Sequence, residues 1–166
     1  MITSKIVSTA DDQQDYHFSL VPDRIPPALA DHLGPLLGRA HEAHRRLSLA
    51  ALAPLELTPK GFGALRVLDA EGPMSQRRLA ERQGIDRTTA VAVVDQLERL
   101  RAVERRRDPA DRRAHALHVT ARGKRLLARG RSAIASAEQA FMAPLPEAEQ
   151  ERLKQALRAL IEASRG

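Results

Sequence analysis

The sequence predicts a mainly α-helical protein with one small β-hairpin. Aromatic residues make up only 2% of the 166 residues, and Trp and Cys are absent, so the core must come from Leu, Ala, Val and Ile. Leu and Ala are strong helix formers. Apolar residues recur at helical spacing in several segments, and an arginine-rich, hairpin-like stretch interrupts them at residues 101–120.

The first 28 residues are polar and proline-containing, and we expect an arm without strong structure of its own. A long helix is predicted from Leu29 to about Ala53, ended by Pro54. One face of this helix carries an apolar stripe at Leu33, Leu36, Leu37, Ala40, His44, Leu47 and Ala51.

Capping residues divide the next segment into three helices. Thr58 and Pro59 begin a helix that stops at Gly72, Ser75 begins a short one that Gly84 breaks, and Asp86 begins a third that runs to about Leu100. We expect these helices to bury Phe62, Leu65, Leu68, Leu79, Ala80, Ala90, Val93, Val94 and Leu97.

Residues 102–120 resemble two strands joined by a turn at residues 108–111. Thr120 should then cap a helix that buries apolar residues, and prolines 144 and 146 separate it from a last helix. The apolar stripes of these two helices are Leu126, Leu127, Ile134 and Phe141, then Leu153, Leu157, Leu160 and Ile161.

The outer helices carry more apolar surface than one small core can bury, which predicts a partner, most simply a second copy. We therefore divide the chain into an N-terminal arm (1–28), a dimerisation helix (29–54), a winged helix-turn-helix lobe (55–125) and C-terminal dimerisation helices (126–166).

Positive charge is concentrated in the middle of the chain. The net charge is +6, yet residues 60–131 contain 18 Lys and Arg against 9 Asp and Glu, and both flanks are slightly acidic. This distribution is typical of a nucleic-acid site. Arg provides 23 of the 27 basic residues, which a GC-rich genome would also produce.

Absent residues and segments exclude other classes. Without Cys there can be no disulfide, thiolate zinc site or thiol-based sensor. No apolar run of membrane-spanning length occurs, and the N-terminus lacks a signal-peptide core, so we expect a cytoplasmic protein that does not enter a membrane. No cofactor or metal is expected.

The two helices after Ser75 form a helix-turn-helix, whose second helix can enter the major groove. There Arg87 can contact guanine or phosphate, the threonines offer hydroxyls, and the small apolar residues can touch a thymine methyl. The predicted DNA face of the two helices is Ser75, Gln76, Arg77, Arg87, Thr88, Thr89, Val91 and Ala92. An amphipathic helix with a solvated face would give the same pattern.

The hairpin favours DNA binding over a solvated face. Its tip carries Asp111, Arg112 and Arg113, which can place a guanidinium in the minor groove. Arg105 and its neighbours on the first strand can neutralise phosphates. An isolated arginine run is usually just solvated, but this one directly follows a helix-turn-helix.

Together these residues resemble the MarR family of bacterial transcriptional regulators, from about residue 29 to residue 163. In the family's wing pattern D-x-R-x(5)-L-T, Val119 replaces the usual Leu. The matching residues are Leu79-Ala80, Asp86-Arg87-Thr88-Thr89, Asp95-Gln96-Leu97-Glu98, Val103-Glu104-Arg105, Asp111-Arg112-Arg113, Thr120 and Gly123.

The resemblance implies a homodimeric repressor that binds double-stranded DNA at a pseudo-palindromic operator and is released by a small anionic aromatic effector. It also implies that Asp111 positions Arg113 in the minor groove, with Arg112 as the competitor. Two departures stand out. Arg101 occupies a position that is often Gly, so we expect the helix to end without a free left-handed residue, and Val91-Ala92 replaces a common Thr-Arg pair.

Arg39, His41, His44 and Arg45 lie on or near the apolar stripe of the first long helix and could bind an anionic effector. Packing between helices is the commoner role for such histidines. A zinc site beginning at His41, Glu42 and His44 is a further alternative, but no residues complete it.

Two other functional classes remain as alternatives. A helical adaptor could use the basic lobe to bind an acidic protein. An enzyme is not expected, because the sequence has no serine elbow, phosphate loop or complete metal set.

Overall fold

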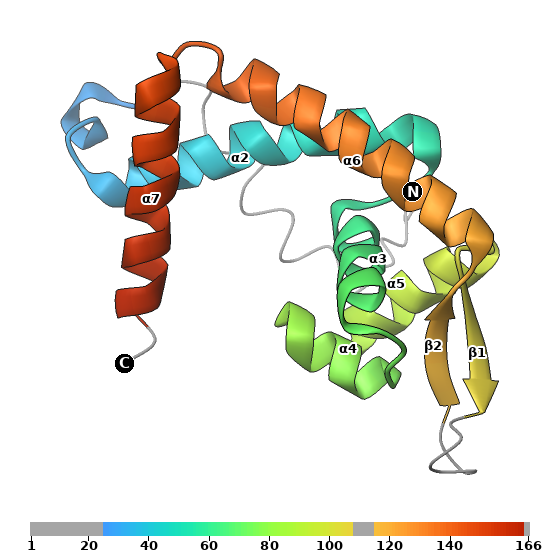
Figure 1. Cartoon of the computed structure of the whole chain (residues 1–166). Helices are drawn as coiled ribbons and strands as arrows, with labels where there is room; N and C mark the ends of the chain where they lie inside the picture. The colour runs from blue at the N-terminus through green and yellow to red at the C-terminus, as the bar shows by residue number, and fades with distance from the viewer. Residues whose placement is uncertain (1–24, 108–114, 165–166) are drawn as a thin grey trace, which may run out of the picture. The chain divides into compact units, whose positions relative to one another are not determined.

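The structure, a computed structural model, describes residues 25–107 and 115–164, in two compact units divided between Ala43 and His44. It is mainly helical with one two-stranded antiparallel sheet, as predicted. The described elements in Figure 1 are η1 (Pro27–Leu29), α2 (Leu33–Leu52), η2 (Ala53–Leu55), α3 (Pro59–Glu71), α4 (Gln76–Gln83), α5 (Arg87–Arg99), β1 (Val103–Arg107), β2 (His115–Val119), α6 (Ala121–Met142) and α7 (Glu147–Ala163).

The first long helix begins at Leu33 and not at Leu29 as predicted. A short 3₁₀ turn over Pro27–Leu29 precedes it. Pro35 explains the later start, because proline has no N–H to donate and is tolerated in an α-helix only within the first turn. Leu29 therefore lies in the 3₁₀ turn and not in the same helix as Leu33.

Four predicted N-caps are confirmed, and each side chain accepts a hydrogen bond from the backbone N–H three residues later. Each bond satisfies an N–H group that the first helical turn leaves without a partner. The acceptors are Thr58 (3.0 Å), Ser75 (3.3 Å), Asp86 (2.9 Å) and Thr120 (3.0 Å).

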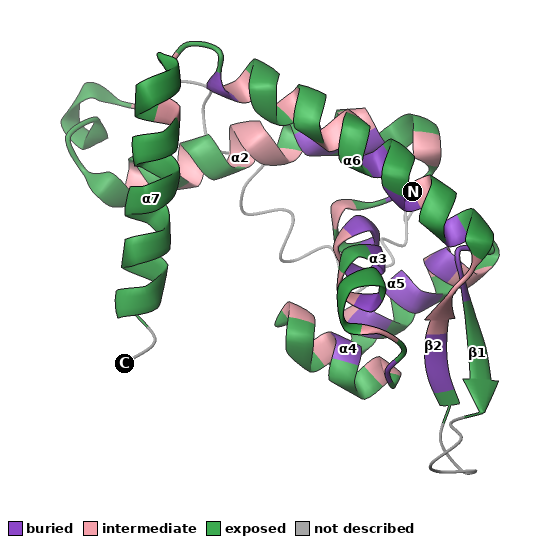
Figure 2. Cartoon of the chain, viewed as in Figure 1, coloured by how far each residue is buried: buried purple, intermediate pink, exposed green. Residues whose placement is uncertain are grey.

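One core joins α3, α4, α5, the sheet and α6, and Figure 2 shows its buried residues on the facing sides of these elements. All the predicted core residues of α3 and α5 are buried. The largest fully buried side chains are Leu52, Leu65, Leu79, Val94, Leu97, Leu117 and Leu127, each below 2% exposed.

The sheet is the predicted wing, with Val103 paired to Val119 and Arg107 paired to His115. Met74 also pairs with this sheet: Leu117 N–H of β2 donates to Met74 O at 2.8 Å in an isolated antiparallel bridge. A single bridging residue leaves no alternating pattern, so the sequence analysis did not predict it. The bridge ties the wing to the segment that leads into α4.

The end of α5 corrects the sequence analysis. Arg101, one residue beyond the C-cap Leu100, has φ +53°, so the helix does end in a left-handed residue although it is not glycine. Its N–H donates to Glu98 O at 2.8 Å, and Ala102 N–H donates to Leu97 O at 2.8 Å. These closing bonds impose the left-handed conformation on Arg101 despite its β-carbon.

We expect Arg101→Gly to stabilise the fold by about 0.5–1 kcal/mol, because relief of left-handed strain exceeds the entropy that glycine gains on unfolding. Urea unfolding at equal protein concentration measures the change. Gly84→Ala is the matched control, since Gly84 has φ +63° and nothing lies within 4 Å of an added Cβ. Gly84→Ala should lower the urea midpoint. Equal midpoints for wild type and Arg101→Gly would show that the left-handed conformation of Arg101 is not strained.

Apolar side chains also lie on outer helix faces. Leu160 and Ile161 of α7 are 55% and 54% exposed, and Leu153 and Leu157 of the same stripe are exposed as well. Leu47 of α2 is exposed too. Among the described residues, no helix is both long and apolar enough to cross a membrane.

Candidate nucleic-acid interface

Helices α4 and α5 form the predicted helix-turn-helix. Gly84 closes α4 in the left-handed conformation, and Ile85 N–H donates to Ala80 O at 3.1 Å. Ile85 packs against the core, which anchors the turn. Asp86 then begins α5, so the direction of the second helix is set by a glycine, an apolar anchor and an N-cap in succession.

The outward face of α5 carries the residues predicted to read DNA. Arg87, Thr88, Val91 and Ala92 are all exposed, while the opposite face is buried in the core. Thr89 differs from this prediction in its chemistry. It is half-buried, and its hydroxyl donates to Asp86 Oδ2 at 2.6 Å, so that donor is already engaged.

The same contact lowers the pKa of Asp86, mainly because the Thr89 side chain and backbone both donate to the carboxylate. A lowered pKa in the folded state means that the cap is fully effective above the usual carboxyl pKa of about 4 and is lost as the pH falls through the lowered value.

We therefore expect Asp86→Asn, a cap that does not titrate, to be less stable than wild type at neutral pH and to lose that deficit on acidification. Thermal unfolding of both proteins between about pH 7 and pH 3 measures the gap. A gap that stays constant over this range would show that the carboxylate charge contributes nothing to the cap.

A groove of about 600 Å³ lies between the two helices and is bordered by Gln76, Arg77 and Arg87. Arg77 forms only a long ion pair with Glu81, at 3.7 Å, and its side chain is 89% exposed. Such a surface pair is weak and easily exchanged for another anion. Both arginines can therefore turn toward a phosphate at the start of α5.

The wing root supplies further basic residues, but their charges are partly neutralised within the protein. Arg105 Nε donates to Glu98 Oε1 of α5 at 3.0 Å, and Arg106 pairs with Glu104 on the same strand. Arg105 is therefore held against the recognition helix. The predicted tip residues Asp111, Arg112 and Arg113 lie outside the described residues.

Two hydrogen-bond clamps that hold the interface were not predicted. Gln96 Nε2 of α5 donates to Glu56 O at 3.0 Å, and Thr58 Oγ1 donates to Gln96 Oε1 at 2.8 Å. Thr120 Oγ1 donates to Arg101 O at 2.7 Å, which joins the two ends of the hairpin. Both clamps link residues far apart in sequence, so no local pattern signals them.

Comparison with known proteins decides the family. A model described as the MarR family matches residues 55–114. A protein of Thauera aromatica named for the transcriptional regulation of the hcr operon is 36% identical over 123 residues, which is 74% of each chain. The chain belongs to the MarR family. It is thus a transcriptional regulator.

Solved structures of MarR regulators resemble this chain over most of their length. PcaV of Streptomyces coelicolor is 35% identical with a TM-score of 0.69, covering 81% of this chain and 98% of its own. CouR, solved on a 23-mer DNA duplex, is 32% identical with a TM-score of 0.75, covering 83% and 99%. The winged helix-turn-helix of this MarR protein is therefore the family's own fold.

The predicted effector residues are not brought together within one described unit. His44 packs edge-on against Phe141, with ring centroids 5.5 Å apart, which is the helix-packing role weighed above. Arg39 and His41 belong to the unit that ends at Ala43, and Arg45 belongs to the other. An effector site at these four residues of the MarR chain stays a prediction.

A cleft of about 640 Å³ between α3, α4 and α6 was not predicted. Arg82 forms a bidentate pair with Glu71, which holds the pKa of that carboxyl below its usual value, and Arg131 pairs with Asp69 at 3.0 Å. Gln83 Oε1 is buried there without a hydrogen-bond partner among the described residues. An unsatisfied buried acceptor suits a ligand that carries a hydroxyl donor.

Proposed function

We propose that this MarR protein is a homodimeric repressor that binds a pseudo-palindromic operator in double-stranded DNA and leaves it when a small anionic aromatic effector binds. The exposed row on α5, presented at the N-terminal end of a capped recognition helix, carries the proposal. CouR, a relative of the same fold, was solved on duplex DNA. For the present protein we propose a role that is regulatory and not catalytic. We place the protein in the cytoplasm, where a bacterial operator is accessible.

In this proposal the start of α5 lies in the major groove. Arg87 contacts guanine or phosphate, Thr88 offers a hydroxyl, and Val91 with Ala92 contacts thymine methyl groups. Ser75, Gln76 and Arg77 contact the DNA from the start of α4, and Arg105 contacts a phosphate at the wing root. With only apolar residues at 91 and 92, phosphate and minor-groove contacts carry much of the affinity.

The dimer follows from the apolar faces of the outer helices. The exposed leucines and isoleucine of α7, and Leu47 of α2, would be covered by a second copy. A two-fold dimer places two recognition helices about 34–36 Å apart, one turn of the double helix. The proposal also keeps the N-terminal arm at residues 1–28 and the other domain limits that the sequence predicts.

For the effector we propose the cleft between α3, α4 and α6. Lys60 and Arg66 line it with the two paired arginines, and Val67 and Ile85 supply apolar surface. An aromatic carboxylate with a hydroxyl matches these features. PcaV was solved with its natural ligand, and CouR of Rhodococcus jostii with p-coumaroyl-CoA. A ligand that competes for Arg131 or Arg82 would loosen α6 or α4 from α3.

A gel shift with the DNA upstream of the protein's own gene tests the function. We expect a saturable, sequence-selective shift whose affinity falls steeply as salt rises, because bound phosphates release counterions. Hydroxylated aromatic acids added to the complex should release the DNA. The adaptor alternative predicts no selective shift, and a flat salt dependence would exclude DNA binding of this kind.

The wing tip gives a separate prediction. Arg113→Ala should weaken operator binding about tenfold and leave the dimer folded, because it removes one minor-groove guanidinium. Fluorescence anisotropy with labelled operator measures the affinity, and size-exclusion chromatography checks the dimer. Arg112→Ala is the neighbouring control; a larger loss for Arg112→Ala would transfer the minor-groove role to Arg112.

A further inference from the structure

A second cleft, of about 380 Å³, lies at the far end of the recognition helix from Arg87. Its walls are the segment before α3, the C-cap of α5 and the first half of α6. The 13 residues of α5 separate it from Arg87 by about 20 Å at 1.5 Å per residue. The cleft therefore shares no residue with the DNA face or with the cleft proposed for the effector.

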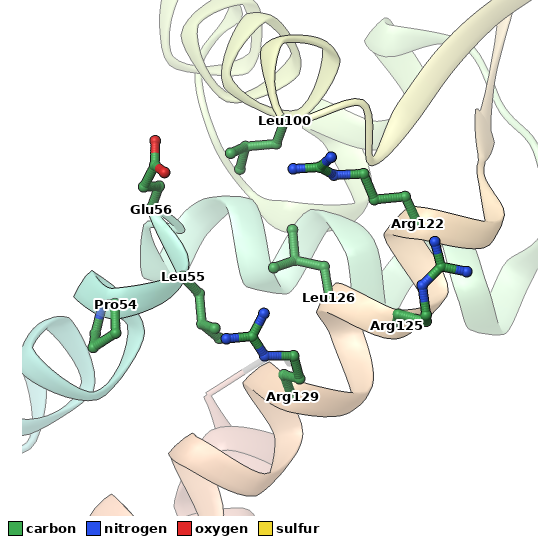
Figure 3. Close-up of a pocket in the computed structure, with 8 residues that line it drawn as sticks. All are labelled: Pro54, Leu55, Glu56, Leu100, Arg122, Arg125, Leu126 and Arg129. Atoms are coloured by element: carbon green, nitrogen blue, oxygen red, sulfur yellow. The ribbon is translucent and has the colours of Figure 1, made fainter.

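Three arginines surround an apolar floor in this cleft. Arg122, Arg125 and Arg129 recur at i, i+3 and i+7 along α6, so they lie on one face of the helix. Figure 3 shows Leu126 pointing into the space between Leu55 and Leu100, with the Arg122 guanidinium directed toward Leu100 and that of Arg129 toward Leu55.

The charge of the cleft is uncompensated. Among the described residues, no carboxylate forms an ion pair with any of these three arginines, whereas Arg77, Arg82, Arg105, Arg106 and Arg131 each pair with one. Glu56 is the only acidic residue of the lining. Three like charges along one helix face repel one another, so an anion bound between them would be favoured.

We propose that this cleft binds an organic anion with a carboxylate or phosphate group and a short apolar body. The guanidinium groups hold the head, and Leu55, Leu100 and Leu126 cover the body. Duplex DNA fits less well, because its phosphates offer nothing to cover three leucines in a concave site. The inference concerns ligand binding alone and does not depend on the proposed operator.

The site also contacts the helix that reads DNA. Leu100 is the C-cap of α5, and Glu56, with φ +53°, accepts through its carbonyl oxygen a hydrogen bond from Gln96 of α5 at 3.0 Å. A bound anion would thus lie between α6 on one side and, on the other, the C-cap Leu100 and the residue Glu56 that is hydrogen-bonded to Gln96.

Hexyl phosphate is a suitable probe, with inorganic phosphate and hexanol as controls for the body and the head. Calorimetry on the full chain without DNA should give saturable binding of hexyl phosphate and much weaker binding of both controls. Arg122→Gln and Arg129→Gln should each weaken it about tenfold, the order expected for one charge-assisted hydrogen bond. Arg152→Gln, at an exposed position on α7, should leave it unchanged.

NMR of the Leu, Val and Ile methyl groups of the unmutated protein gives an independent measurement. Hexyl phosphate should shift the methyl signals of Leu55, Leu100 and Leu126 and leave those of Val67 and Ile85 in the other cleft unchanged. Binding that is weakened equally in Arg152→Gln, or shifts confined to Val67 and Ile85, would overturn the proposal. So would arginine variants that weaken DNA binding while hexyl phosphate binds as before.

Discussion

Gly123→Ala should destabilise the protein by about 3 kcal/mol or more, the upper range for overpacking a site that cannot relax. A Cβ at this position would lie 2.0 Å from Ala102 O, 2.9 Å from Ala102 C and 2.9 Å from Val119 Cγ1. The obstacle is backbone, which cannot turn aside as a flexible side chain could. Urea unfolding followed by circular dichroism measures the loss.

The same substitution should disrupt the wing root. Ala102 O accepts from Thr120 N–H at 3.0 Å, and the Gly123 N–H donates to Thr120 Oγ1, so moving the carbonyl breaks the junction between the hairpin and α6. Gly34→Ala is the matched control, because nothing lies within 4 Å of its added Cβ. Its midpoint should be unchanged or slightly raised. Equal midpoints for both variants would disprove the close approach.

Arg87→Ala should weaken operator binding by about 1–3 kcal/mol, or roughly 5- to 150-fold, the cost of one good guanidinium contact to a base. Arg87 is the first residue of α5, is exposed, and borders the groove between α4 and α5. Its side chain lies outside the hydrophobic core, so the variant should fold as wild type. Anisotropy titrations with operator and with unrelated duplex measure the change.

The titration with unrelated duplex distinguishes a base contact of Arg87 from a phosphate contact. Loss of a base contact lowers operator affinity far more than affinity for unrelated DNA, whereas loss of a phosphate contact lowers both equally and reduces the salt dependence. Arg152→Ala, which removes the same charge from an exposed position on α7, is the control. Operator affinity unchanged in Arg87→Ala would remove this residue from the interface.

Local chemistry made most of the fold predictable. The N-caps Thr58, Ser75, Asp86 and Thr120 act on N–H groups only three residues away, so their effect is written in short stretches of sequence. The buried stripe of α5 follows from helical periodicity in the same way. The start of α2 was missed because apolar spacing alone does not register the constraint at Pro35.

The location of the candidate site was predictable from the sequence, but the ion pairs that its arginines form were not. The positive segment and the exposed row of α5 follow from charge and spacing. Which arginines are neutralised depends on neighbours that are distant along the chain: Arg131 pairs with Asp69, while the three arginines of the second cleft have no described acidic partner. Charge counting cannot distinguish these two groups.

The sequence by itself determined the order of helices and strands, their caps, the direction of the recognition helix and the family. Only the tertiary structure decided the left-handed conformation of Arg101, the bridge from Met74 to Leu117, the closeness of Gly123 to Ala102, and the apolar floor beneath the arginines of α6. The first group depends on contacts within one or two helical turns. The second depends on packing between segments that meet only when the chain has folded.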